Sequence, residues 1–264
     1  AIYYTDAIVI GILLNPVAVT YYAIGGNLIE YLRRLLLISN SVLNPLISEL
    51  DSKKDSDSIR DVIISGARLS MMLALPIAAI YLLMGRQFIG HWMGSEYAKL
   101  SGDVLAVLCV GVTLSTPQST ISSALYGISR HNIIAKLRIV EATCNLALSL
   151  VLINSLGIVG VALGTVIPQV ILMAVLLPLL SLRTLGIPLS RYLIDAYAFP
   201  ILAVTPFAIA CYLIQKHFPA DSLFPFLGQL LLLSPVFFFG AWFIALKQRE
   251  RNYCRDFVGK AVLR

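Results

Sequence analysis

Long runs of apolar residues without any charge dominate the chain, and short polar segments separate them. The charge-free runs are Leu69–Gly85, Val104–Ser129, Ala142–Leu182, Ala196–Gln215 and Ser222–Leu246. A helix needs about 20 apolar residues to cross the roughly 30 Å hydrocarbon core of a bilayer. Because the runs are continuous rather than alternating, they predict membrane helices and not barrel strands. The run Ala142–Leu182 is long enough for two crossings, with a turn at 154–157.

Composition supports the same class of protein. The 264 residues are 58% hydrophobic and only 13% charged, with a mean hydropathy of +0.85. Soluble domains carry about 25% charged residues, so lipid is expected to be the main solvent. The longest polar segments are Asp51–Asp61 and the basic tail Lys247–Arg264. We therefore expect neither a soluble domain of useful size nor a nucleic-acid partner.

Three charged residues, Glu30, Arg33 and Arg34, lie between the apolar runs of the first fifty residues. In one arrangement, a helix kinked at Asn15–Pro16 ends at these charges. In the other, the chain turns at Asn15–Pro16 and a long helix from about 17 to 50 carries the charges in its middle. In the first arrangement the three charges mark the end of a membrane helix, whereas in the second they lie at membrane depth.

The distribution of lysine and arginine favours the long helix, because cytoplasmic loops carry an excess of these residues. With the first turn outside, only Arg86, Lys99 and Lys216 of the 20 basic residues lie outside. Arg33 and Arg34 lie within the long helix, and the other fifteen, Arg68 among them, fall on the inside, in loops, at the inside ends of helices or in the tail. We therefore predict a cytoplasmic C-terminus, with the tail as an anchor to anionic lipid.

The predicted fold is an all-α integral membrane bundle of about eight segments, the first of them truncated. A helix over 17–50 would be about 50 Å long, so it must tilt, bend or extend into the cytoplasm. The chain opens with Ala1 and has no basic region before its first apolar run. We read it as the C-terminal part of a longer protein. The segments are 1–14, 17–50, 64–90, 104–128, 132–154, 157–182, 196–216 and 223–247.

Two stretches of the sequence resemble a known superfamily. Residues 6–50 contain an aspartate, Ile-Gly, a short turn, a Val-x-x-Tyr-Tyr-Ala block and a Pro-Leu-Ile-Ser ending. Residues 116–171 contain Leu-Tyr-Gly, Asn-Leu-Ala-Leu and Gly-Ile-Val-Gly-Val-Ala-Leu-Gly-Thr. Both look like Wzx-type polysaccharide and O-antigen flippases of the MOP (multidrug/oligosaccharidyl-lipid/polysaccharide exporter) superfamily.

The resemblance implies a protein of two lobes around a central cavity. Residues 1–185 would form the second, C-terminal lobe, and residues 186–264 two added helices with the tail. The missing N-terminal lobe would be a partner within the same protein. The implied activity is the flipping of an undecaprenyl-pyrophosphate oligosaccharide across the bacterial inner membrane by alternating access, for polysaccharide or O-antigen biosynthesis.

Arg33, Arg34 and Glu30 are the first candidates for substrate binding. Two arginines and a glutamate facing lipid would cost on the order of 8 kcal/mol on insertion scales, so they should face a cavity or each other. Glu30 can reach Arg33 at i+3 or Arg34 at i+4, which leaves one positive charge for a pyrophosphate. The alternative is a set of charges that extend to the cytoplasmic interface.

Other polar residues in the helices carry similar alternatives. Arg138 is a second substrate-binding candidate or an inside anchor. Asp6 and Glu141 are candidates for proton or sodium coupling, and Asp6 alternatively marks an interface. Gln118, with the serines that follow it, lines the cavity or bonds to a neighbouring helix. Tyr21, Tyr22 and Trp92 are expected in interfacial aromatic belts.

Enzymatic chemistry is not indicated. The sequence has no HExxH, GxSxG or P-loop, and its four cysteines have no metal spacing, so no metal or cofactor is expected. One rival function is a MATE-like exporter of cationic drugs, which would favour acidic residues in the cavity. A rival from another class is a membrane glycosyltransferase or ligase, which would need larger outside loops than residues 85–103 provide.

Overall fold

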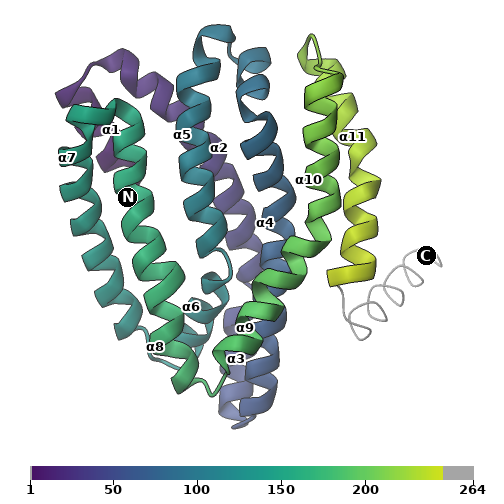
Figure 1. Ribbon diagram of the computed structural model, residues 1–264. Coiled ribbons are helices and arrows are strands. Elements are labelled where there is room, and N and C mark those ends of the chain that lie inside the picture. Colours follow the sequence, from purple (N-terminus) through teal and green to yellow (C-terminus); the bar gives the residue numbers. More distant parts are fainter. Residues whose placement is uncertain (1, 246–264) are drawn as a thin grey trace.

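A computed structural model describes residues 2–245, and every element in them is helical (Figure 1), which confirms the predicted all-α bundle. The basic tail, with its predicted anchoring role, lies outside the described residues. The helices are α1 (Ile2–Leu13), α2 (Pro16–Asn40), α3 (Leu43–Ser52), α4 (Ser56–Trp92), α5 (Ser95–Ser115), α6 (Gln118–Gly127), α7 (Asn132–Gln169), η1 (Val170–Leu176), α8 (Leu177–Thr184), α9 (Leu189–Leu193), η2 (Ile194–Ala198), α10 (Phe199–His217), α11 (Leu223–Gly240) and η3 (Ala241–Ala245). The η elements are π-helical.

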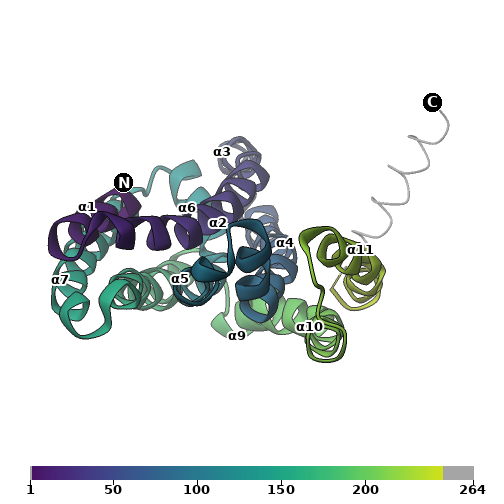
Figure 2. The same cartoon turned by 90° about the horizontal axis from the view of Figure 1, so that it is seen from above.

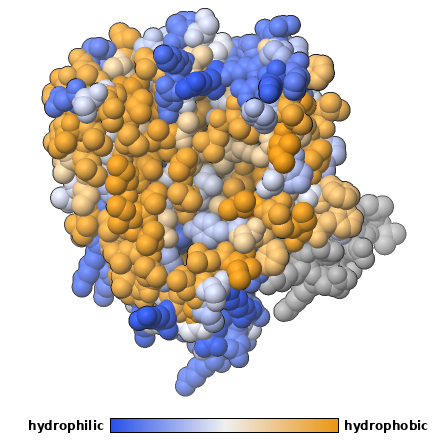
Figure 3. Space-filling view, viewed as in Figure 1, coloured by the Kyte–Doolittle hydropathy of each residue, from blue (hydrophilic) through white to orange (hydrophobic). Residues whose placement is uncertain are grey.

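The helices form an elongated bundle. Seen from above, α1 and α7 lie at one end, α2, α5 and α4 in the middle, and α10 and α11 at the other end (Figure 2). Apolar side chains cover most of the face in Figure 3, and hydrophilic ones gather at its two ends. Within residues 2–245, five helical stretches are long and apolar enough to cross a membrane: Ser56–Trp92, Ser95–Ser115, Asn132–Thr184, Leu189–His217 and Leu223–Ile244.

The chain turns at Asn15–Pro16, as predicted. The Asn15 side chain accepts a hydrogen bond of 2.7 Å from the Ala18 N–H, and Pro16 takes the first helical position, where its missing N–H costs nothing. α2 then continues without a break past Glu30 and the two arginines to Asn40. The alternative in which a helix ends at these charges is therefore wrong.

Two of the predicted long helices are divided. The segment predicted over 17–50 breaks at Ser41–Val42, and the one predicted over 104–128 breaks at Thr116–Pro117. A proline removes a backbone donor and clashes with the carbonyl four residues earlier, which is Ser41 for Pro45. The helix over 17–50 was expected to tilt, bend or extend into the cytoplasm, and it ends at Asn40 instead.

The predicted turn inside 142–182 lies at Gly157. Its φ of 59° and ψ of −140° interrupt α7 and divide it into two halves, which pack against each other in antiparallel directions. The halves approach closely because two glycines lie between them. A Cβ on Gly160 would lie 2.3 Å from the Leu152 carbonyl oxygen, and one on Gly164 would lie 2.4 Å from the Ser149 hydroxyl. Small residues at such positions let membrane helices pack.

Arg68 does not lie at the inside end of its helix, where the charge count placed it. α4 begins at Ser56, eight residues before the predicted segment, and Arg68 lies inside it with 1% of its surface exposed. Its Nη1 donates to Asp195 Oδ1 in η2 at 3.2 Å. α10 and α11 pack on α4 through a shared apolar cluster that includes Met84, Phe207 and Phe226. The domain boundary at 185 remains a prediction.

Candidate functional site

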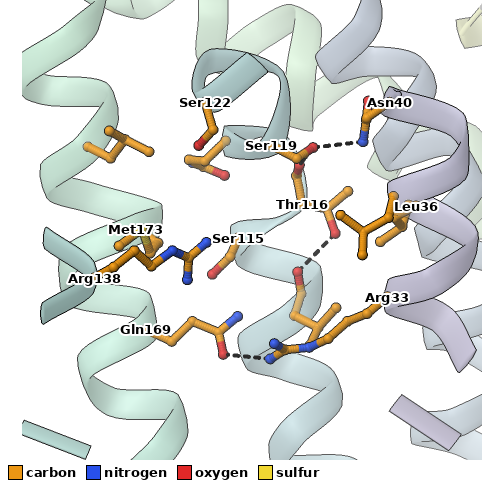
Figure 4. Close-up of a pocket in the computed structure, with 14 residues that line it drawn as sticks. Arg33, Leu36, Asn40, Ser115, Thr116, Ser119, Ser122, Arg138, Gln169 and Met173 are labelled. Atoms are coloured by element: carbon orange, nitrogen blue, oxygen red, sulfur yellow. Dashed lines mark hydrogen bonds between the residues drawn. The ribbon is translucent and has the colours of Figure 1, made fainter. Parts of the chain in front are cut away.

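A polar cavity of about 190 Å³ lies between α2, the α5–α6 break, and the α7–η1 segment (Figure 4). The break at Thr116–Pro117 turns polar residues of α6 toward the space. Among residues 2–245, the charged residues that line the cavity are Arg33 of α2 and Arg138 of α7. Serines, a threonine and amides supply the rest of its polar lining: Asn40, Ser115, Thr116, Gln118, Ser119, Ser122 and Gln169.

Arg33 is held in the cavity wall by an amide. Its Nη2 donates to Gln169 Oε1 at 3.1 Å, and Gln169 Nε2 donates to the Gly111 carbonyl oxygen at 3.3 Å. Gln169 therefore joins the guanidinium of α2 to the backbone of α5. This arrangement orients the guanidinium group at the cavity.

Arg138 enters the cavity from the opposite wall, as Figure 4 shows. Its Nη1 donates to Glu141 Oε2 at 2.8 Å, one turn along α7. Glu141 is buried, with 3% of its surface exposed, and it is not among the residues that line the cavity. The pair therefore presents the arginine to the cavity and keeps the carboxylate behind it.

Glu30 and Arg34 lie apart from this site. Arg34 Nε donates to Glu30 Oε1 at 3.2 Å, and the two side chains are 66% and 39% exposed for Arg34 and Glu30 respectively. Neither belongs to the cavity lining. Of the five predicted substrate-binding residues, the structure brings together Arg33, Arg138 and Gln118. A role for Glu30 and Arg34 stays a prediction.

Gln118 combines the two alternatives considered for it. It lines the cavity, and its Nε2 donates to the Ala174 carbonyl oxygen at 3.1 Å and to the Tyr197 hydroxyl at 2.7 Å. The Tyr197 hydroxyl in turn donates to the Leu114 carbonyl oxygen at 2.8 Å. The η2 segment that precedes α10 is thus bonded to the wall of the cavity.

Asp6 lies at the centre of a second, fully buried polar cluster, with 1% of its surface exposed. Its Oδ2 accepts hydrogen bonds from the Tyr22 hydroxyl at 2.7 Å and the Thr165 hydroxyl at 2.8 Å. Asn145 Nδ2 lies 3.4 Å from Asp6 Oδ1 and 2.7 Å from the Thr165 hydroxyl. Asp6 and Glu141, the two predicted coupling residues, therefore do not share a site.

The position of Tyr22 corrects an expectation. It was predicted to lie in an interfacial aromatic belt, but only 2% of its surface is exposed and its hydroxyl donates a hydrogen bond to Asp6. The partners of Asp6 and Arg33 were also missed. Asn145 and Gln169 were detectable as amides within a charge-free run, since such residues are expected to find a partner inside a membrane bundle.

No group of three or more histidine, cysteine, aspartate or glutamate side chains that could hold a metal ion occurs in the described part of the chain. The Asp6 cluster is instead built from one carboxylate with an amide and two hydroxyls. The amide nitrogen and both hydroxyls donate to the carboxylate, so its oxygens are held by hydrogen-bond donors. An ionisable residue inside a membrane bundle is a candidate site for a proton or a cation.

Helices able to span a membrane around a polar, arginine-lined cavity define a multi-pass membrane protein of the transporter type. The sequence profile of the lipid II flippase MurJ family matches residues 6–229, and the chain belongs to this family. This is a family of flippases and not of enzymes.

Known proteins agree with this assignment. A Haloferax volcanii protein described as a low-salt glycan biosynthesis flippase is 27% identical over 160 residues, 61% of this chain and 34% of its own length. A Shigella flexneri protein described as an O-antigen transporter is 24% identical over 180 residues, 68% of this chain and 42% of its own length. The resemblance to polysaccharide flippases of the MOP superfamily is thereby confirmed.

The fold has a solved counterpart. A structure of lipid II flippase MurJ in an inward closed conformation matches with a TM-score of 0.64 and 17% identity, over 91% of this chain and 50% of that one. The chain thus spans half or less of the length of each of these relatives.

Proposed function

We propose that this chain forms the C-terminal part of a flippase for a lipid-linked oligosaccharide. The cargo would be an undecaprenyl-pyrophosphate oligosaccharide, moved across the bacterial inner membrane for polysaccharide or O-antigen biosynthesis. Family membership and the descriptions of the relatives support the reaction class. The N-terminal lobe of the same protein would complete the cavity, and the C-terminus would lie in the cytoplasm.

The observation that carries the proposal is the pair of arginines that face the cavity from α2 and α7. Guanidinium groups bind phosphate oxygens through parallel hydrogen bonds, so two such groups suit a pyrophosphate. The neutral amides and hydroxyls around them can bond to sugar hydroxyls. A cation exporter would require acidic lining residues instead, and in the part of the chain that the structure describes none lines this cavity.

The proposed mechanism is alternating access with cation antiport. Binding of the pyrophosphate by Arg33 and Arg138 would draw α2 and α7 together, because the two arginines come from opposite walls. The proline-associated breaks and π-helical segments give the helices positions at which they can change shape. Asp6 would bind the coupling ion where α1 contacts the same two helices, since its partners Tyr22 and Asn145 belong to them.

Neighbouring arginines offer a matched test in the natural full-length protein. Arg33→Ala removes the cavity charge, and Arg34→Ala removes an exposed charge one residue away. We expect Arg33→Ala to lower export of the glycan by about tenfold or more, because a hydrogen bond to a charged group contributes about 1.5–3 kcal/mol. Arg34→Ala should stay within about twofold, because exposed ion pairs contribute little.

Export is measured as surface glycan in cells that depend on the variant, with membrane insertion checked for each. Arg33→Lys separates charge from geometry and should restore only part of the export, because lysine lacks the planar fork. Wild-type export from a stably inserted Arg33→Ala variant would remove this residue from the mechanism. An equal loss in both alanine variants would contradict a role for the cavity.

A further inference from the structure

A second pocket, separate from the cavity, lies where several helices end. It has a volume of about 410 Å³, and it is lined by the end of α3, the start of α4, the α6–α7 loop and the α8–α9 loop. These elements meet at the lower end of the molecule in Figure 1, where hydrophilic side chains gather in Figure 3. The positive-inside prediction places the same end in the cytoplasm.

The charge of the pocket is positive. In the described part of the chain, Arg60, Arg130 and Arg183 line it together with one acidic residue, Asp51. The three arginines are far apart in the sequence, and the fold brings them to one space. Positive charges held close together repel each other, and an anion bound between them would offset this repulsion.

One of the three arginines is fixed by the pocket wall. Arg60 Nε donates to the Leu185 carbonyl oxygen at 3.1 Å, and its Nη1 donates to Asp57 Oδ1 at 2.7 Å. Gly186 makes this approach possible: its φ is 66°, and a Cβ there would lie 2.7 Å from Arg60 Nη2. Arg60 thus orders the loop, and Asp57 offsets part of its charge.

The other two arginines have their donors available. Arg130 and Arg183 are exposed, and within residues 2–245 their side chains form no hydrogen bond or ion pair with the protein. Arg130 lies on the α6–α7 loop and Arg183 in the last turn of α8, and both line the same pocket as Arg60. Fork-shaped donors on either side of an open space suit a phosphate, whose oxygens can accept from both.

We propose that this pocket binds a phosphate group, and in particular the headgroup phosphate of an anionic phospholipid. Basic pockets between membrane helices on the cytoplasmic side are suited to such headgroups. Apolar residues beside the pocket support a lipid over a soluble ion. Thr184 lines the pocket, and Leu180, one turn earlier on the same face of α8, is 47% exposed. Acyl chains could follow this face into the membrane.

The test measures binding and not transport. The full-length protein, purified in neutral detergent, is titrated with phosphatidylglycerol or phosphatidylcholine, and bound lipid is counted by native mass spectrometry. Arg130→Ala/Arg183→Ala removes the two open donors. Lys53→Ala/Lys54→Ala removes two exposed charges from the same end of the molecule, outside the pocket, and serves as the charge-matched control.

We expect selective binding of phosphatidylglycerol to the wild type. The arginine double variant should bind it about tenfold more weakly or worse, because each basic residue near an anionic lipid contributes about fivefold. The lysine control should lose much less. Arg183→Gln alone, which retains size and polarity, should give an intermediate loss and serves if the double variant folds poorly. Lipid binding is measured without transport, so failure of the proposed transport cycle would not affect the result.

A parallel arm tests the soluble source of the same chemistry. Inorganic phosphate is compared with chloride at equal ionic strength by the shift in melting temperature of the same variants. A shift in the wild type that Arg130→Ala/Arg183→Ala abolishes, without selective lipid binding, would assign the pocket to soluble phosphate. No selectivity for either ligand, or equal losses in the arginine and lysine double variants, would overturn the proposal.

Discussion

Arg33 and Arg34 are neighbours in the sequence but have different surroundings. Successive residues of an α-helix point about 100° apart, so one arginine faces Gln169 and the cavity while the other pairs with Glu30. The sequence predicted that Glu30 would pair with one of the two arginines. It could not decide which one, because Glu30 can reach residues at both i+3 and i+4. That choice depends on the rotation of α2 against α5 and α7.

At the same scale, Asp6→Asn tests cation coupling. The amide keeps an acceptor for Tyr22 and Thr165, so the fold should persist, but the negative charge that would hold a cation is lost. We expect gradient-driven transport by the full-length protein in vesicles to fall by about tenfold, as for other contacts with a charged group. The rate is measured under a proton or a sodium gradient.

Asp221→Asn makes the same chemical change in the exposed loop before α11 and should have no effect on transport. If Asp6→Asn retains the wild-type dependence on both gradients, Asp6 stabilises the helix bundle and does not couple transport to an ion gradient. The contacts of Asp6 come from residues 16, 139 and 159 positions away. An aspartate among apolar residues was visible in the sequence, but these partners required the fold.

At the scale of the elements, apolar runs and prolines predicted most of the architecture. Within the described residues, all eight predicted segments are helical, and the turns at Asn15–Pro16 and Gly157 are where they were expected. The breaks at Ser41–Val42 and Thr116–Pro117 were not, because a proline can either bend a membrane helix or end it. The outcome depends on whether neighbouring helices satisfy the freed carbonyl groups, which sequence alone does not reveal.

Gly157 allows the turn in α7 to be tested separately from steric crowding. A Cβ at Gly157 would meet nothing within 4 Å, yet its φ of 59° and ψ of −140° suit only glycine. We therefore expect Gly157→Ala to destabilise the protein by about 1–3 kcal/mol through backbone strain alone. The measurement is thermal unfolding of the purified protein in detergent.

Gly228→Ala in α11 is the matched control, because a Cβ there also meets nothing, and the backbone is helical. Alanine favours a helix over glycine, so this variant should be neutral or slightly more stable. Equal stability of the two variants would show that residues 154–157 relax without cost, and that Gly157 does not define the turn.

At the scale of the whole molecule, a buried ion pair joins the two regions predicted from the sequence. Arg68 of α4 and Asp195 of η2 are 1% and 9% exposed in their side chains. The neighbouring η2 residue Tyr197 bonds to Gln118 at the cavity, so the segment that leads into α10 is tied to both α4 and the cavity wall. The added helices therefore have a direct connection to the candidate site.

This connection predicts a large and non-additive effect on stability. Arg68→Met or Asp195→Leu alone leaves an uncompensated charge in the interior, and each should cost about 3–5 kcal/mol. The double variant removes both charges and keeps most of the apolar volume, so it should lose much less than either single variant. Arg191 and Asp61 form a pair at 3.1 Å between α9 and α4, with side chains 50% and 61% exposed. Removing either partner there should cost under about 1 kcal/mol.

Stability and transport together separate two roles for the buried pair. If Arg68 and Asp195 only hold α4 and η2 together, the double variant should regain both thermal stability and glycan export. If their charges also fix the position of Tyr197 against Gln118, export should stay low while stability returns. If the single variants were as stable as the exposed-pair controls, Arg68 and Asp195 would not be buried. An unpaired charge in the interior lowers the free energy of unfolding.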